Sequence, residues 1–222
     1  MKYKFKYFGT KEELTEKLTL SGADLSNCSV RSYALDNEVE LDVTEREYFD
    51  VCDALGDALY SEENVSLSRV LVDFLAENNL VIATAESCTG GLVAARIVDA
   101  PGASKVFYEG VVTYANEAKE ARLNVSEETL EKYGAVSEQT AKEMAYGLLS
   151  ENVDIAVSTT GIAGPDGGTP EKPVGLVYIG IAFRGEEPFA IECRYAGSRN
   201  DIRRSAANEA LYRTYNYLYS TL

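Results

Sequence analysis

The sequence of 222 residues contains no histidine, and this absence is its most restrictive feature. Without an imidazole, Ser-His-Asp and Cys-His catalysis are excluded, and so is every metal site that needs a histidine ligand. A hydrolase with a side-chain nucleophile would therefore have to use a lysine, tyrosine, aspartate or glutamate as its general base.

Cysteine is scarce, and long apolar runs are missing. Cys28, Cys52, Cys88 and Cys193 form no C-x-x-C pair, whereas disulfide frameworks and zinc sites need closer spacing. No run approaches the length of a membrane span, and residues 1–6 alternate apolar side chains with lysine, unlike a signal peptide. We therefore expect free thiols, no membrane partner and a cytoplasmic location.

Positive charge is also in short supply, because the net charge is −15 and the pI is about 4.5. Such a field repels nucleic acid, so we expect no nucleic-acid partner. A phosphate group on a small ligand would have to be held by local donors rather than by the overall charge.

Residues 1–64 predict a small α+β unit with the order βαββα. Its expected elements are a strand over 2–8, a helix from Thr10 to about Leu20, strands over 28–35 and 38–43 around Asp36-Asn37, and a helix after Thr44 with Phe49, Cys52 and Leu55 or Leu59 on one face. The polar residues 61–64 follow no pattern, so we place a boundary there.

Residues 65–222 alternate helices with apolar strands, which is typical of a layered α/β domain. The expected strands span 80–83, 105–114, 155–158, 174–183 and 188–195, and a last helix begins at about Asn200. Because the final two strands read as a hairpin, the sheet should be mixed.

Residues 84–91, Thr-Ala-Glu-Ser-Cys-Thr-Gly-Gly, join an apolar strand to a helix. Glycines let a ligand approach the backbone closely, and a helix N-terminus offers unpaired N–H groups to an anion. Serine and threonine are also common N-caps, and glycine is common in turns. The segment by itself fits a capping turn and an active site equally well.

Two other expected strands end in small or polar residues, at 114–119 and at 159–168. Ligands of open α/β sheets bind beyond the carboxyl ends of the strands, so the three segments should converge on one site. Ser87 is the candidate nucleophile and Lys119 the candidate base, because burial can lower the pKa of a lysine towards neutrality.

Both roles have alternatives. Lys119 also fits a solvated helix lysine, and Lys105 and Lys172 compete with it as the base. Cys88 competes with Ser87, because a helix N-terminus can lower the pKa of a thiol, although it also fits a small buried core residue.

Three neighbouring residues could assist this pair. Glu86 could bond the loop, orient Lys119 or only contribute charge. Tyr114 and Asn116 could position a substrate, although a tyrosine at the end of a strand is more often a packing residue.

Five blocks occur in order along the second unit: AESCTGG at 85–91, VTYANEAK at 112–119, GAVS at 134–137, TGIAGPDGG at 160–168 and EKPVG at 171–175. Together they resemble the CinA C-terminal family, which contains nicotinamide mononucleotide (NMN) amidohydrolases. The resemblance covers about residues 65–222. Residues 1–64 more weakly resemble the KH-like middle region of full-length CinA proteins, whose large molybdopterin-binding-like N-terminal domain and pyrophosphatase activity we expect to be absent.

The resemblance implies a three-layer α/β/α domain that hydrolyses the carboxamide of NMN through a Ser/Lys dyad, with the serine at Ser87 and the lysine at Lys119. It implies no metal and no organic cofactor. The alternative is a nucleotide-binding or regulatory protein of this family that has lost turnover. RNA binding by residues 1–64 is disfavoured, because they lack a G-x-x-G loop and carry 7 basic against 15 acidic side chains. We expect this unit to pack against the larger one or to mediate homo-oligomerisation.

Backbone N–H groups of residues 88–91, or of Thr160 and Gly161, would stabilise the oxyanion of an amide-hydrolysis intermediate. Arg199 and Arg203 are natural phosphate ligands, or else helix-start arginines paired with surface carboxylates. The family usually has Gly-Asp-Arg where this sequence has Gly197-Ser198-Arg199. The expected substrate-binding residues are Glu86, Thr89, Gly90, Gly91, Tyr114, Asn116, Thr160, Gly161, Gly164, Arg199 and Arg203.

Overall fold

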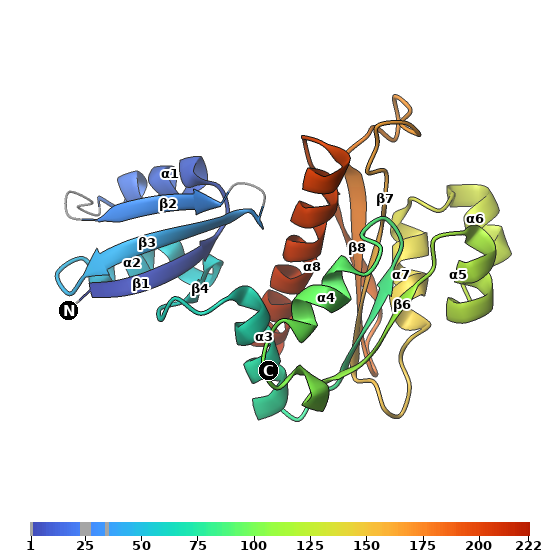
Figure 1. The fold of residues 1–222 in the computed structure, drawn as a ribbon, viewed down its shortest axis with the longest axis horizontal. Coiled ribbons are helices and arrows are strands. Elements are labelled where there is room, and N and C mark those ends of the chain that lie inside the picture. The colour runs from blue at the N-terminus through green and yellow to red at the C-terminus, as the bar shows by residue number, and fades with distance from the viewer. Residues whose placement is uncertain (1, 23–27, 34–35) are drawn as a thin grey trace.

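The computed structural model describes residues 2–22, 28–33 and 36–222, which form two β-sheets (Figure 1). The first sheet has four strands in the order β2-β3-β1-β4, and the second has five in the order β6-β5-β7-β8-β9. None of the described helices is long and apolar enough to cross a membrane.

The first sheet is antiparallel and carries two helices. Its elements are β1 (Lys2–Phe8), α1 (Lys11–Ser21), β2 (Ser29–Tyr33), β3 (Glu38–Thr44), α2 (Tyr48–Leu55), the short 3-10 helix η2 (Gly56–Ala58) and β4 (Leu59–Ser61). The predicted order βαββα is confirmed, and β4 is an additional strand. Residues 34 and 35, the expected end of the second strand, lie outside the described residues.

The buried face of α2 differs from the prediction. Val51 and Leu55 are buried, whereas Phe49 is 78% exposed. The helix begins at Tyr48, and Thr44 does not cap it, because the Thr44 hydroxyl donates to the Glu47 carboxylate instead. The later start leaves the i, i+4 pair of Val51 and Leu55 facing the sheet, and Leu59 belongs to β4.

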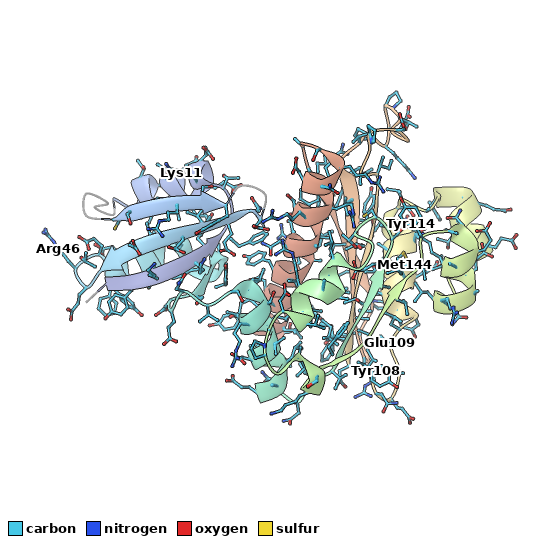
Figure 2. The ribbon with its side chains drawn as sticks, viewed as in Figure 1. Lys11, Arg46, Tyr108, Glu109, Tyr114 and Met144 are labelled. Carbon is cyan, nitrogen blue, oxygen red and sulfur yellow. The ribbon has the colours of Figure 1, made fainter. Side chains whose placement is uncertain are left out.

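The second sheet is mixed, as expected. Its strands β5 (Ile82–Glu86), β6 (Phe107–Val112) and β7 (Ile155–Gly161) are parallel, whereas β8 (Leu176–Phe183) and β9 (Phe189–Arg194) are antiparallel. The edge strand β6 is largely exposed, and Figure 2 labels Tyr108 and Tyr114 near its two ends.

Helices cover both faces of this sheet and complete three layers (Figure 1). One face carries α3 (Leu67–Glu77), α4 (Leu92–Val98) and α8 (Arg199–Thr221); the other carries α5 (Asn116–Leu123), α6 (Glu127–Tyr133) and α7 (Glu138–Tyr146). A 3-10 turn, η3 (Ala103–Lys105), precedes β6.

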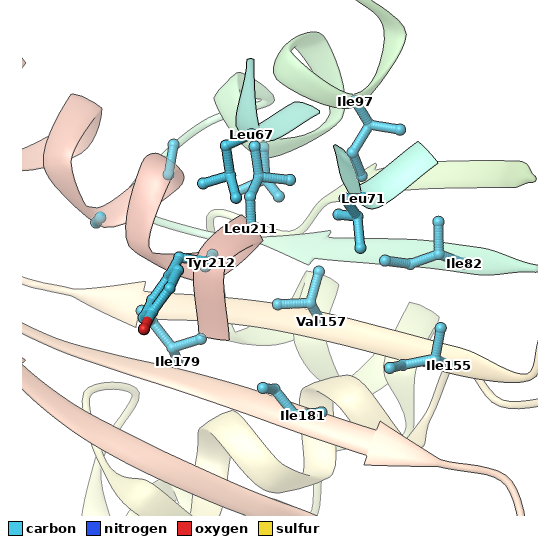
Figure 3. Close-up of a cluster of buried hydrophobic side chains, with 14 of the residues drawn as sticks. Leu67, Leu71, Ile82, Ile97, Ile155, Val157, Ile179, Ile181, Leu211 and Tyr212 are labelled. Carbon is cyan, nitrogen blue, oxygen red and sulfur yellow. The ribbon is translucent and has the colours of Figure 1, made fainter. Parts of the chain in front are cut away.

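A separate apolar cluster fills each interface between helices and sheet. On the α8 face, Leu71, Ile97 and Leu211 meet Ile155 and Val157 of the sheet (Figure 3). Burial of such side chains contributes roughly 1.5–3 kcal/mol each, so this face supplies much of the stability.

On the opposite face, α7 approaches the sheet very closely at Gly180. A Cβ atom at this position would lie 2.3 Å from the Ala141 carbonyl oxygen and 2.5 Å from the Ser158 hydroxyl. Only glycine lets the helix and strand meet at this distance.

The two units contact each other through α8. The rings of Phe8 and Tyr212 stack with centroids 3.9 Å apart. The Asp36 carboxylate accepts from Arg96 at 2.6 Å and from Arg204 at 2.8 Å. The first unit therefore rests on α4 and α8, and we refer to the Asp36 contacts and the ring stack as the docking interface.

Candidate active site

Three parallel strands end side by side at one edge of the second sheet. Glu86 is in register with Val112 on one side and with Thr159 on the other. The residues that follow these strands line a cavity of about 240 Å³, slightly smaller than the roughly 300–1,000 Å³ typical of ligand sites. Its lining comprises Ser87, Cys88, Tyr114, Lys119, Ala135, Val136, residues 160–164, Asp166, Gly167 and Arg199.

Ser87 and Lys119 meet in this cavity. The Nζ atom of Lys119 lies 3.1 Å from the Ser87 Oγ, and it donates to the carbonyl oxygens of Thr113 at 2.8 Å and Tyr114 at 3.3 Å. The Lys119 side chain points inward from the first turns of α5 and is only 1% exposed. It is therefore not a solvated helix lysine.

Burial lowers the pKa of Lys119 below its ordinary value of 10.5. Among the described residues, no carboxylate forms an ion pair with its amine, so little opposes the desolvation. A neutral amine has two N–H donors and one lone pair. The two carbonyls can take both donors, and the lone pair is then available to accept the Ser87 hydroxyl proton.

Glu86 holds the turn that presents Ser87. Its buried carboxylate accepts from the Thr89 hydroxyl at 2.6 Å and from the backbone N–H groups of Gly91, Val93 and Ala94 at 2.8, 3.1 and 2.8 Å. These donors lie at the start of α4, where a negative charge also stabilises the helix dipole. Glu86 does not line the cavity; of its three proposed roles, bonding the loop is the one observed.

Gly90 and Gly91 shape this turn. Both have positive φ angles, 61° and 96°, a conformation that side chains disfavour. The Thr89 hydroxyl, which donates to Glu86, also lies 2.6 Å from the Thr159 hydroxyl and must accept its proton. Thr89, Gly90 and Gly91 thus lie behind the cavity and are not part of its lining.

Cys88 is a buried thiol rather than an exposed one. It is 5% exposed, and burial raises its pKa to about 12 despite the nearby backbone N–H groups and Lys119. Because the thiolate is the reactive form, Cys88 is a poor nucleophile at neutral pH.

Backbone N–H groups beside Ser87 divide into those that donate to a backbone carbonyl and those that do not. The N–H of Ser87 donates to the Thr159 carbonyl, and that of Gly90 donates to the Ser87 carbonyl. Within the described part of the chain, the N–H groups of Cys88 and Thr89 donate to no backbone carbonyl. Both lie close to the Cys88 thiol and next to the candidate nucleophile.

The two arginines differ in position. Arg199 lines the cavity, and its guanidinium donates to the Gly164 carbonyl at 2.8 Å and to the Tyr114 hydroxyl at 2.9 Å. Arg203 lies behind the turn, where it donates to the carbonyls of Cys88 at 3.2 Å and Thr89 at 2.8 Å. Neither arginine forms an ion pair with a described carboxylate.

Of the other expected residues, four line the cavity and one does not. Thr160, Gly161 and Gly164 line the cavity, and the Thr160 hydroxyl donates to the Ala135 carbonyl at 2.6 Å. Tyr114 lines it as well, although it is 61% exposed. Asn116 is exposed at the start of α5 and does not line the cavity.

The competing lysines lie elsewhere. Lys105 is exposed at the end of η3. Lys172 donates to the Tyr133 carbonyl at 2.6 Å. Neither residue lines the cavity.

Six cavity residues were not expected from the sequence: Ala135, Val136, Ile162, Ala163, Asp166 and Gly167. Their segments carried a signal, because GAVS and TGIAGPDGG are two of the five blocks named above. No group of three or more His, Cys, Asp or Glu side chains among the described residues could hold a metal ion.

Comparison with known proteins covers the same part of the chain. A family model of the CinA C-terminal domain matches residues 64–218. A competence-damage inducible protein of Clostridium novyi is 48% identical over 200 residues, which is 84% of this chain and 48% of that protein. One of Acetivibrio thermocellus is 47% identical over 212 residues, or 88% of this chain and 51% of that protein. The chain thus spans about half the length of the curated relatives it matches.

Solved structures agree with these matches. The competence/damage inducible protein CihA of Agrobacterium tumefaciens has a TM-score of 0.65 and 43% identity, covering 67% of this chain and 91% of that one. A CinA superfamily protein of Escherichia coli has a TM-score of 0.65 and 34% identity, covering 68% and 88%. The family match, the identities and the three-layer fold together show that this chain belongs to the CinA family and contains its C-terminal domain.

Proposed function

We propose that the protein is an amidohydrolase that converts NMN to nicotinic acid mononucleotide and ammonia through Ser87 and Lys119. The observation that carries this proposal is the buried Lys119 amine, 3.1 Å from the Ser87 hydroxyl and without an acidic partner among the described residues. A lysine in this environment is suited to act as a base, and the sequence contains no histidine to take that role.

In the proposed reaction, neutral Lys119 takes the proton of Ser87 as the serine oxygen attacks the carboxamide carbon. The carbonyl electron pair moves to oxygen. The N–H group of Cys88, a residue that lines the cavity and whose N–H donates to no backbone carbonyl among the described residues, is the candidate donor to this oxyanion; one such donor typically contributes about 10²–10³ in rate. The protonated lysine then gives its proton to the departing nitrogen, and ammonia leaves. Water, deprotonated by Lys119, hydrolyses the ester and restores Ser87.

The choice of NMN rests on the family resemblance of the five sequence blocks and on the charges in the cavity. The pyridinium ring withdraws electrons from the carboxamide and makes its carbon more electrophilic. Arg199 is the candidate phosphate ligand, because a guanidinium has five N–H donors and Arg199 makes only two hydrogen bonds to other described residues. Arg203 already makes three such hydrogen bonds, two of which hold the turn behind Ser87.

The test is ammonia release from NMN by the wild-type protein and by the Ser87→Ala and Cys88→Ala variants. We expect Ser87→Ala to lose at least about 10³-fold in kcat while NMN binding, measured by calorimetry, persists. Cys88→Ala should keep most of the activity, because its thiol is protonated and buried.

Undiminished turnover by Ser87→Ala would contradict the role of the dyad. Binding of NMN without ammonia release by the wild-type protein would instead support the alternative of a nucleotide-binding protein that has lost turnover.

A further inference from the structure

Among the described residues, Asp166 is the only acidic side chain that lines the cavity. It is exposed and lies in the glycine-rich segment between β7 and β8. Among the described residues it forms no ion pair, and no hydrogen bond to its carboxylate is found there. A carboxylate at a cavity wall without a partner in the protein can accept hydrogen bonds from a ligand.

The neighbours of Asp166 fix the part of the cavity to which it belongs. Two residues before it, the Gly164 carbonyl accepts from Arg199 at 2.8 Å, so Asp166 and Arg199 share one wall. Ser87 and Lys119 are buried, 8% and 1% exposed, whereas Asp166 and Arg199 are both exposed. The cavity therefore has a buried reactive end and an open end that carries both charges.

A mononucleotide bound in this cavity would reach from its buried end to its open end, with base, ribose and phosphate in that order. Under the proposed function, its carboxamide lies at Ser87 and its phosphate at Arg199, so the ribose lies between them beside the wall that contains Asp166. The ribose of NMN offers two adjacent hydroxyl donors, and a carboxylate is an acceptor with two oxygens. A carboxylate that hydrogen-bonds ribose hydroxyls is a common solution in nucleotide sites.

We infer that Asp166 is a specificity-determining residue that accepts hydrogen bonds from the ribose hydroxyls of the nucleotide substrate. This inference rests on the proposed function for the orientation of the ligand. On this inference, the open end of the cavity selects ribonucleotides over amides that lack the ribose diol.

The test uses a pair of ligands that differ only in the diol, NMN and its 2′,3′-dideoxy analogue. Binding is measured by calorimetry in the Ser87→Ala background, with and without Asp166→Ala. We expect Asp166→Ala to weaken NMN binding about tenfold, the loss typical of a hydrogen bond to a charged group, and to leave the affinity of the dideoxy analogue unchanged. Asp166→Asn, which keeps one acceptor oxygen, should give an intermediate loss.

Glu171→Ala is the matched control, because it removes the same charge from the same segment at a position outside the cavity lining. It should affect neither ligand. Equal losses of affinity for NMN and for the dideoxy analogue would overturn the inference and indicate that Asp166 interacts with the charge of the pyridinium ring instead. No loss for either ligand, or no binding of NMN at all, would also overturn it.

Because these measurements use binding to the Ser87→Ala protein, they do not depend on turnover. A wild-type protein that binds NMN with the expected Asp166 dependence but releases no ammonia would refute the proposed function and leave the inference standing.

Discussion

Lys119 is the residue on which the proposed chemistry depends, and its environment is unfavourable for a charge. Burial lowers its pKa below 10.5, and its polar partners are two carbonyls and one hydroxyl. The same burial that favours the neutral amine, the form that can accept a proton, also lowers the stability of the fold, since polar groups are costly to bury.

Burial of Lys119 should make the stability of the fold depend on pH. Between the lowered pKa and 10.5, the unfolded chain binds a proton at Lys119 that the folded chain does not, so stability rises with pH in this window. Lys119→Met removes this difference. We expect the variant to be inactive but about 1 kcal/mol more stable at pH 7, with the gap closing as the pH approaches 10.5.

Urea unfolding of both proteins from pH 7 to 10 measures the gap. A gap that does not change with pH over this range would contradict a lowered pKa of Lys119 in the folded protein.

At the scale of elements, the turn between β5 and α4 is organised by Glu86. One carboxylate accepts four hydrogen bonds from the start of the helix, and the next residue is the candidate nucleophile. The helix start and the candidate active site are thus one structure, and both interpretations of residues 84–91, capping turn and candidate site, apply to it.

Glu86→Gln tests this arrangement. The amide keeps the shape but turns an NH₂ group towards backbone N–H donors, so we expect a loss of about 1.5–3 kcal/mol in the free energy of unfolding and a parallel fall in kcat. Glu138→Gln is the control, because Glu138 is exposed and pairs with Lys142 in a surface i, i+4 salt bridge, where a loss of only about 0.3–0.5 kcal/mol is typical. Equal losses in the two variants would show that Glu86 is not required at the helix start.

Sequence patterns predict helices, strands and the residues at their ends well where the pattern is local. The ends of three apolar strands identified Ser87 and Lys119 as candidates, because parallel strands bring their carboxyl ends to one edge of a sheet. The strand β4 escaped prediction because three residues, Leu59–Ser61, are too few to show a period. The prediction that placed Phe49 on the same helix face as Leu55 was wrong. A side-chain contact sets the start of α2, and the start determines which residues face the sheet.

Other features of the site depend on contacts between distant residues. Arg203 binds carbonyls 114 and 115 positions away, so its sequence context suggests a ligand contact, not support of a turn. Asp166 stands in a glycine-rich block, and only the folded structure shows that it is the acidic residue of the cavity lining. Such relations are set by the tertiary fold and leave no local pattern.

At the scale of the whole molecule, Asp36 connects the two units. Its carboxylate pairs with Arg96 of α4 and Arg204 of α8, and its carbonyl accepts from Asn208. Burial raises the pKa of Asp36, but the hydrogen bonds from Arg204 and Arg96 outweigh this effect and hold it below its ordinary value of 3.8. The boundary at residue 64 stays a prediction, although residues 59–64 pair with β1.

We expect Asp36→Asn to loosen the docking interface, because it removes both ion pairs and leaves Arg96 half-buried without a counter-charge. The expected loss is about 1–3 kcal/mol, with faster hydrogen exchange in β1 and the first turns of α8. In the wild type, this stabilisation is present above pH 3.8 and is lost as the pH falls through the lowered pKa.

Asp73→Asn, which breaks a half-buried i, i+4 pair with Arg69, is the matched control. Unchanged exchange in Asp36→Asn would mean that the stacking of Phe8 on Tyr212 is sufficient to hold the two units together.

The position of α8 in the chain has a consequence for biosynthesis. This helix supplies Arg199 to the cavity, Arg203 to the turn behind Ser87, Leu211 to the core and Tyr212 to the docking interface. It is also the last described element in chain order. A nascent chain on the ribosome therefore exposes the part of the large sheet that α8 covers, and has neither a complete cavity nor a docked first unit, until residues 199–221 have been synthesised.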